Sequence, residues 1–256
     1  MSSLEIRQIP VLNDNYVYLV HDKATGKTAC VDPAVSAPVI ATAKELGWDI
    51  SHILVTHPHY DHIDGIADIV EAYSSVVYGS RPDYGLIPKC DHGVGQGDEI
   101  EIGASKVSVL VVPGHTANHI AYQFEADKAL FVGDTLFSLG CGRLLGGSAK
   151  QMWDSLCKLR SLPTDTRVYC AHEYTNANAD FALSIDPNNA DLQARAAEVI
   201  QLREQGLPTI PTTIESEARC NPFLRCDMPA FKAVLAMADY EAEEVFAEIR
   251  KQKDHF

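Results

Sequence analysis

Basic residues are scarce in this chain of 256 amino acids. It has 21 lysines and arginines against 35 aspartates and glutamates, which gives a formal net charge of -14. Nucleic acids and anionic membrane surfaces bind clusters of lysine and arginine, so we expect neither as a partner. An anionic ligand would have to meet local positive charge, supplied by a metal ion or by a few well-placed basic side chains.

Long apolar runs and paired cysteines are also missing. No stretch approaches the roughly 18 apolar residues of a membrane span, and the N-terminus lacks the basic and apolar blocks of a signal peptide. The seven cysteines are scattered and include no C-x-x-C pair. This pattern is typical of reduced thiols, and we expect a soluble, cytoplasmic monomer.

The pattern of apolar residues divides the chain into two parts. Hydrophobic residues make up 46% of the chain, enough for a sizeable core. Up to residue 173, predicted strands alternate with helices, and after it helical periodicity dominates apart from an extended segment predicted at 208–225. We therefore expect two domains, 1–173 and 174–256. The expected strands are 4–12, 15–22, 28–34, 50–56, 75–80, 106–114, 119–126, 128–135 and 166–173, and the expected helices are 36–47, 66–73, 148–162, 190–206, 229–239 and 241–253.

The stretch THPHYDHIDG, residues 56–65, places three histidines and two aspartates directly after an apolar strand. His57 and His59 alternate on an extended backbone, so their rings can converge, and Asp61 and His62 follow at the turn into a helix. Imidazoles and carboxylates are good ligands for zinc or iron. A solvated histidine-rich loop is the alternative, but this spacing after a buried strand favours a metal site.

Three further candidate ligands follow apolar strands: His115 in PGHTANH, Asp134 in VGDT and His172 in YCAHE. Loops beyond strand ends are where sheet proteins assemble active sites from residues distant in sequence. Taken alone, each histidine is more often structural, and Asp134 could cap a turn. Together with the first motif, they predict a catalytic metal site with positions left for water.

These motifs together resemble the metallo-β-lactamase superfamily. More narrowly, GDTLFSLGCGRLLGG, AHEYT, NPFLR and the final KQKDHF resemble glyoxalase II, the hydroxyacylglutathione hydrolases, from about Leu12 to Phe256. The resemblance implies an α/β (α+β) fold, a four-layer αββα metallo-β-lactamase sandwich with a C-terminal helical domain. It also implies hydrolysis of S-(2-hydroxyacyl)glutathione, such as S-D-lactoylglutathione, in the second step of methylglyoxal detoxification.

The resemblance further implies two divalent metal ions per chain, with zinc expected first and iron or manganese as alternatives. It places His57, His59 and His115 on one ion. It places Asp61, His62 and His172 on the other, with Asp134 bridging both. Asp134, Asp61 and His62 are expected to be the catalytic residues, beside a metal-held hydroxide that attacks the thioester carbonyl.

A glutathione thioester carries two carboxylates, so the resemblance assigns its binding to Arg143, Tyr174, Arg250 and Lys253. Arg250 and Lys253 are three residues apart and therefore share a helix face. In isolation, each cation would more often be an ordinary surface charge. Leu145 departs from the family, since many members have an aromatic residue there.

Asp32, in TACVDPA, has two open interpretations. It could hold a ligand histidine in the right orientation, or it could simply start a turn before Pro33.

For the whole chain, the alternatives are a related enzyme, such as a persulfide dioxygenase using one iron or a lactam hydrolase, and a non-catalytic module with a closed metal site. Metal content and oxygen consumption would distinguish them.

Overall fold

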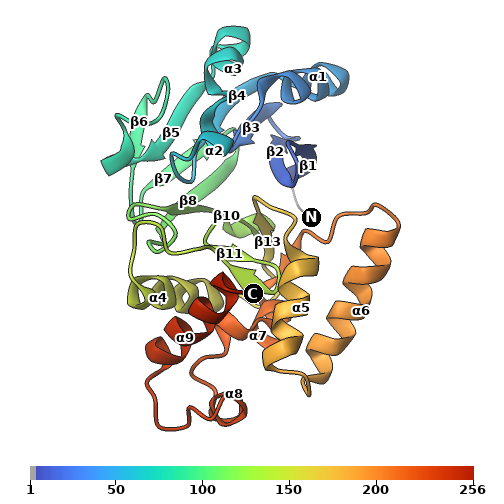
Figure 1. Cartoon of the computed structure of the whole chain (residues 1–256). Coiled ribbons are helices and arrows are strands. Elements are labelled where there is room, and N and C mark those ends of the chain that lie inside the picture. Colours follow the sequence, from blue (N-terminus) through green and yellow to red (C-terminus); the bar gives the residue numbers. More distant parts are fainter. Residues whose placement is uncertain (1–3) are drawn as a thin grey trace. The chain divides into compact units, whose positions relative to one another are not determined.

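The structure, a computed structural model, describes residues 4–256 and divides into two compact units (Figure 1). The first unit contains the residues up to Val111 together with Asn118–Gly133. The second unit contains Val112–Ala117 and Asp134–Phe256. Each unit has its own core, and each is described separately below.

A six-stranded mixed sheet forms the centre of the first unit, in the order β1 to β6. β1 (Leu4–Val11), β2 (Asn15–Asp22) and β3 (Lys27–Val31) are antiparallel, whereas β4 (Ile50–Leu54), β5 (Val76–Ser80) and β6 (His92–Val94) continue parallel to β3. Parallel neighbours need crossover connections, and α1 (Ser36–Leu46) and α3 (Ile66–Tyr73) supply them. These two helices pack against each other and bury Val39 and Ile69 against the sheet.

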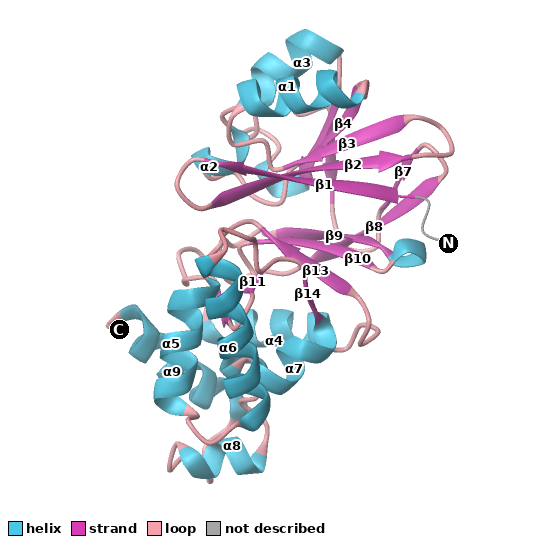
Figure 2. Cartoon of the chain, turned by 90° about the vertical axis from the view of Figure 1, so that its right-hand side faces the viewer, coloured by secondary structure: helices cyan, strands magenta, loops and turns pink. Residues whose placement is uncertain are grey.

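A second, antiparallel sheet in the first unit contains β7 (Glu99–Ile102), β8 (Ser105–Val111), β9 (Ile120–Phe124) and β10 (Ala129–Gly133). Every residue of β9 and β10 is buried, which explains their continuous apolar sequences. The two sheets face each other, as Figure 2 shows, and the Tyr122 hydroxyl donates a 2.8 Å hydrogen bond to the Val55 carbonyl. The first unit therefore has three layers: helices, a mixed sheet and an antiparallel sheet.

The second unit is mainly helical. Its helices are α4 (Ala149–Arg160), α5 (Thr175–Ile185), α6 (Ala190–Glu204), α7 (Ile214–Cys220), α8 (Pro229–Val234) and α9 (Ala242–Asp254). Its strands form two short antiparallel pairs, β11 (Leu136–Phe137) with β12 (Gly140–Cys141) and β13 (Arg167–Cys170) with β14 (Thr212–Thr213). α4 packs on α9 and α5 packs on α6. A capping box of Ser148 and Gln151 begins α4.

Most expected strands and helices lie close to their predicted positions, but the helix expected at 229–239 ends at Val234, and the strands β6 and β7 were not expected. The segment 208–225 was expected to be extended, and this prediction is wrong because α7 lies inside it. The Thr213 side chain caps this helix by accepting from the Ser216 amide, and Glu215 and Glu217 lie favourably in its first turn. Helix α5 was not predicted at all. Within residues 4–256, no helix is both long and apolar enough to cross a membrane.

Candidate functional site

The histidine loop of the first unit, His57–His62, begins three residues after β4 ends. The His57 Nε2 atom lies 2.9 Å from the His59 Nδ1 atom, and the His57 ring centre lies 4.1 Å from that of His62. His57 and His62 are fully buried. The His119 ring stacks on that of His57, with ring centres 4.6 Å apart. The loop therefore gathers buried imidazoles. This arrangement fits a metal site better than a solvated surface loop.

The contacts of Asp32 suit both roles left open by the sequence. Its backbone carbonyl accepts from the Ala34 amide, and its φ of 49° lies in the left-handed region, which aspartate tolerates better than most residues. Its carboxylate accepts from the Thr56 amide at 2.8 Å and from the Thr56 hydroxyl at 2.7 Å. The same carboxylate lies 3.1 Å from the His62 Nδ1 atom. This contact fixes the imidazole so that its Nε2 atom is the one presented for coordination.

Asp61 is oriented by a residue that the sequence did not indicate. Asn15, at the first position of β2, donates from its side-chain amide to the Asp61 carboxylate at 3.1 Å and to the Asp61 carbonyl at 3.2 Å. Nothing in the local sequence of Asn15 signals this contact, because its partner lies 46 residues away. Asn15 is therefore a supporting residue of the histidine loop.

The second unit presents three further candidate ligands, His115, Asp134 and His172, all of them buried. The His115 Nε2 atom lies 3.4 Å from one Asp134 oxygen, and the His172 Nε2 atom lies 3.3 Å from the other. The His115 Nδ1 atom lies 2.9 Å from the Arg143 carbonyl, which fixes the ring. The two oxygens of one carboxylate thus face two different histidines, as a carboxylate shared between two metal ions would.

The chemistry of these side chains fits a divalent metal ion. Within the described residues, the groups suited to metal binding are five histidines and two aspartates: His57, His59, Asp61, His62, His115, Asp134 and His172. Nitrogen and oxygen ligands without cysteine suit zinc, iron or manganese. The carboxylates offset part of the charge of a dication, and the orienting contacts of His62 and His115 are those that metal-binding histidines usually have.

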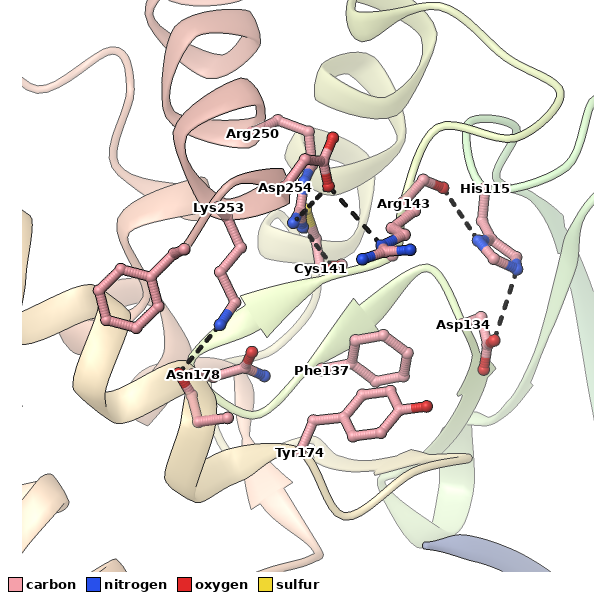
Figure 3. Close-up of a pocket in the computed structure, with 13 residues that line it drawn as sticks. His115, Asp134, Phe137, Cys141, Arg143, Tyr174, Asn178, Arg250, Lys253 and Asp254 are labelled. Atoms are coloured by element: carbon pink, nitrogen blue, oxygen red, sulfur yellow. Dashed lines mark hydrogen bonds and ion pairs between the residues drawn. The ribbon is translucent and has the colours of Figure 1, made fainter.

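A pocket of about 460 Å³ opens in the second unit (Figure 3). All four predicted substrate-binding residues line it, and so do two of the candidate metal ligands. The lining residues with a predicted role are Arg143, Tyr174, Arg250, Lys253, His115 and Asp134. Sequence reasoning missed four others with side chains suited to binding: Phe137, Asn178, Asp254 and Phe256.

The three cations of the pocket differ in how they are held. Arg250 is only 5% exposed, and its guanidinium donates to the Cys141 carbonyl at 2.8 Å and to the Asp254 carboxylate at 3.0 Å. Lys253 is half-buried and donates to the Ala177 carbonyl at 3.0 Å. Burial, together with the charges of Arg250 and Arg143, lowers the pKa of Lys253. Arg143 is largely exposed, so it and Lys253 are the cations best placed to meet a ligand.

Aromatic rings form the middle of the pocket wall. Tyr174 stacks on His172 with ring centres 4.8 Å apart and planes only 1° from parallel. The Phe137 ring meets both of them edge-on, at 5.2 Å from Tyr174 and 5.8 Å from His172. In Figure 3, Phe137 and Tyr174 lie between Asp134 on one side and Asn178 on the other. The wall therefore connects the metal-ligand end of the pocket to its cationic end.

Comparisons with known proteins identify the family of this chain. Residues 11–172 match the metallo-β-lactamase superfamily, and residues 173–256 match the C-terminus of hydroxyacylglutathione hydrolase. The hydroxyacylglutathione hydrolase of Rhodospirillum rubrum is 52% identical over all of both chains. That of Methylococcus capsulatus is 50% identical over 99% of each. The chain belongs to the hydroxyacylglutathione hydrolase family of the metallo-β-lactamase superfamily.

Solved structures also resemble the chain. ETHE1 from Myxococcus xanthus has a TM-score of 0.70 at 28% identity, covering 96% of this chain and 90% of its own. TTHA1623 in a di-iron-bound form has a TM-score of 0.60 at 27% identity, covering 86% of this chain and all of its own. The predicted fold, a metallo-β-lactamase fold followed by a C-terminal helical domain, is confirmed.

The family-specific segment GCGR has a physical explanation in the second unit. A Cβ atom on Gly140 would collide with the Asn178 side chain, and one on Gly142 would collide with the Asp134 carbonyl. Both positions therefore need glycine so that the backbone can pass close to the pocket and to a candidate ligand. Leu145, which departs from the family pattern, is 64% exposed and is not among the described residues that line this pocket.

Proposed function

We propose that this protein hydrolyses the thioester bond of S-(2-hydroxyacyl)glutathione, such as S-D-lactoylglutathione, and releases glutathione and the 2-hydroxy acid. One observation carries the proposal: a single pocket has His115 and Asp134 among its lining residues and also Arg143 and Lys253. Such a pocket suits a substrate with a reactive carbonyl and remote carboxylates. The names of the full-length relatives, about 50% identical, support the same reaction.

We also propose that the site holds two divalent metal ions, most readily zinc, with iron or manganese as alternatives. His57, His59 and His115 would hold one ion. Asp61, His62 and His172 would hold the other, and Asp134 would bridge them. The opposed carboxylate oxygens of Asp134 support the bridging role, and the di-iron form of a structural relative supports a count of two. The orienting contact from Asp32 to His62 supports the assignment of that ligand.

Such a metal pair would supply a nucleophilic hydroxide at neutral pH and would polarise the thioester carbonyl. The side chains of the protein bind and orient the substrate. Asp134, Asp61 and His62 are the side chains that we place nearest the reacting carbon. Hydrolysis forms a bond between a water oxygen and this carbon and breaks the carbon–sulfur bond. The electron pair leaves on the glutathione sulfur, and this thiolate is stable enough to need no dedicated general acid.

The remaining pocket residues would hold the glutathione part of the substrate. Tyr174 and Phe137 flank it with apolar surface, and Arg143 and Lys253 attract its carboxylates by charge-assisted hydrogen bonds. Arg250 would act partly through Cys141 and Asp254, to which it is bound. We accordingly divide the work between a catalytic part, residues 1–173, and a substrate-binding part, residues 174–256, of a cytoplasmic monomer.

The test measures hydrolysis of S-D-lactoylglutathione by the loss of thioester absorbance, beside metal content per chain and oxygen uptake. We expect about two metal ions per chain, hydrolysis, and no oxygen uptake. One iron per chain with oxygen consumption would instead identify a dioxygenase of the same superfamily. Hydrolysis of lactams but not of thioesters would equally reject the proposal.

A further inference from the structure

The β11–β12 hairpin, residues Leu136–Cys141, connects the two ends of the pocket in the second unit. Its Phe137 ring lies in the pocket wall against Tyr174. Its Cys141 carbonyl accepts the hydrogen bond that anchors Arg250. Two residues later, the Arg143 carbonyl contacts His115. A shift of this hairpin would therefore change the shape of the pocket and the anchorage of its cations together.

The hairpin is too short to fix its own position. Its two strands have two residues each, and Leu139 in its turn has a φ of 59°. This left-handed conformation is unfavourable for a leucine, so surrounding contacts must maintain it. One such contact comes from Glu217 in α7, whose carboxylate accepts from the Leu139 amide at 2.8 Å.

Glu217 is fully buried, and all its recorded hydrogen bonds are made within the second unit. One carboxylate oxygen accepts from the Thr212 hydroxyl at 2.7 Å, and the other accepts from the Asn221 side chain at 2.9 Å as well as from Leu139. Burial raises the pKa of Glu217, and these hydrogen bonds oppose that rise. A buried carboxylate is costly, and an apolar residue would fill the same space at lower cost.

Asn221, also fully buried, donates to Glu217 and also binds residues of the hairpin. Its side-chain amide donates to the Phe137 carbonyl at 3.2 Å and to the Gly140 carbonyl at 2.9 Å. Asn178 adds a bond to the Ser138 carbonyl at 3.0 Å. Side chains from outside the hairpin thus bind the backbone of every residue from Phe137 to Gly140.

We propose that Glu217 is a positioning residue that, through Leu139 and Asn221, holds the β11–β12 hairpin in the place required to bind the glutathione part of the substrate. This inference rests on the proposed function. Asp134 lies outside the hairpin, and the neighbouring Thr135 hydroxyl donates to the Val112 carbonyl, a bond that does not involve Glu217. Loss of Glu217 should therefore weaken substrate binding much more than metal binding or turnover.

The test compares Glu217→Ala with Asp22→Ala. Asp22 is an equally buried carboxylate of the first unit and accepts bonds from Ala104, Ala24 and Thr25. Both variants should have a lower thermal midpoint. Only Glu217→Ala should raise KM for S-D-lactoylglutathione, by about tenfold, with metal content unchanged and kcat within about threefold. It should also speed hydrogen exchange at the Leu139 amide.

Glu217→Gln should restore KM, because a glutamine can accept from Leu139 and Asn221 while donating to Thr212. If Glu217→Ala does not fold, Asn221→Ala provides the same comparison, since it removes the bonds to Phe137 and Gly140. Wild-type KM and wild-type Leu139 exchange in a folded variant would overturn the inference. Exchange needs no substrate, so a wild-type protein inactive on the thioester would reject the proposed function and leave the exchange result to decide the positioning role.

Discussion

The histidine loop of the first unit and the pocket wall of the second unit are built in different ways. The loop takes its candidate ligands from six consecutive residues, His57–His62, and two of them, His57 and His59, also contact each other. The wall takes its residues from several separate segments, from His115 to Phe256. A compact loop can be recognised as a motif in one sequence, whereas a dispersed wall can be recognised only through a family or a structure.

The two regions also differ in how tightly their charged groups are held. His57 and His62 are fully buried, and Asp32 fixes one of them directly. In the wall, Arg143 is largely exposed and Lys253 is half-buried. Substitutions in the metal-ligand set should therefore have larger effects than substitutions in the wall, because water can partly replace an exposed contact. The predictions below test this ranking, from the largest effect to the smallest.

Asp134→Asn should have the largest effect, because under the proposed bridging role it would weaken the binding of both metal ions. Asparagine keeps the shape but removes the charge shared between His115 and His172. We expect turnover to fall by at least about 100-fold, together with the metal content, while circular dichroism stays unchanged. Metal analysis and thioester hydrolysis measure both. Full metal content with wild-type turnover would reject the bridging role of Asp134 and would break the ranking.

Asp32→Asn should have the next largest effect. Asparagine also tolerates the left-handed backbone at this position, so the turn should survive. The lost carboxylate no longer holds the His62 Nδ1 atom, and we expect metal affinity to fall about 10- to 100-fold. Competition with a chelator measures it. An unchanged affinity would mean that Asp32 serves the turn alone.

Most of the fold could be predicted from the sequence, because its signals are local. The strand expected at 50–56 is β4, and the helix expected at 36–47 is α1, which ends at Gly47 as a left-handed cap. Helix α5 was missed because polar residues occupy part of its buried face; Asn178 is buried and bonds the hairpin. A polar residue that is buried for its hydrogen bonds interrupts the pattern of apolar residues by which a helix is recognised in a sequence.

The supporting contacts of the site could not be predicted, because they join residues far apart in the chain. Asn15 bonds Asp61 across 46 residues, and Glu217 bonds the Leu139 amide across 78. Such contacts leave no periodic pattern in the sequence. Asp254 was missed for a different reason: an acidic residue was not expected in a pocket for an anionic ligand, yet it holds Arg250.

Lys253→Ala should have a moderate effect that is confined to KM. Lys253 would bind a carboxylate remote from the reacting thioester, so it stabilises the ground state and the transition state alike. Losing about 1.4 kcal/mol of such binding raises KM about tenfold with little change in kcat. Steady-state kinetics on S-D-lactoylglutathione measure this. Lys251→Ala, an exposed position on the same helix, should leave KM unchanged.

An uncharged thioester provides a second control for Lys253→Ala. It has no carboxylate to lose, so its slower hydrolysis should be the same for the variant and the wild type. Equal losses on both thioesters would mean that Lys253 supports α9 through its bond to Ala177 and does not recognise glutathione. Lys253 would then have a structural role, and the pocket wall would lose one of its proposed contacts with the substrate.

The smallest expected effect concerns pH. Burial lowers the pKa of Lys253 from the ordinary 10.5, and the charges of Arg250 and Arg143 lower it further, while Asp180 opposes them. The lysine charge is therefore complete at neutral pH and is lost, as pH rises, earlier than that of an ordinary lysine. KM for the charged thioester should be flat near neutrality and should rise on the alkaline side, beginning below pH 10.5.

Lys253→Arg separates this titration from others in the site. An arginine stays protonated throughout the accessible range, so the alkaline rise in KM should disappear in the variant. Any titration of the metal-ligand set would remain in both proteins, because neither change touches it. If the variant and the wild type keep the same alkaline rise, Lys253 does not carry it, and the loss of the Lys253 charge is not what weakens substrate binding at high pH.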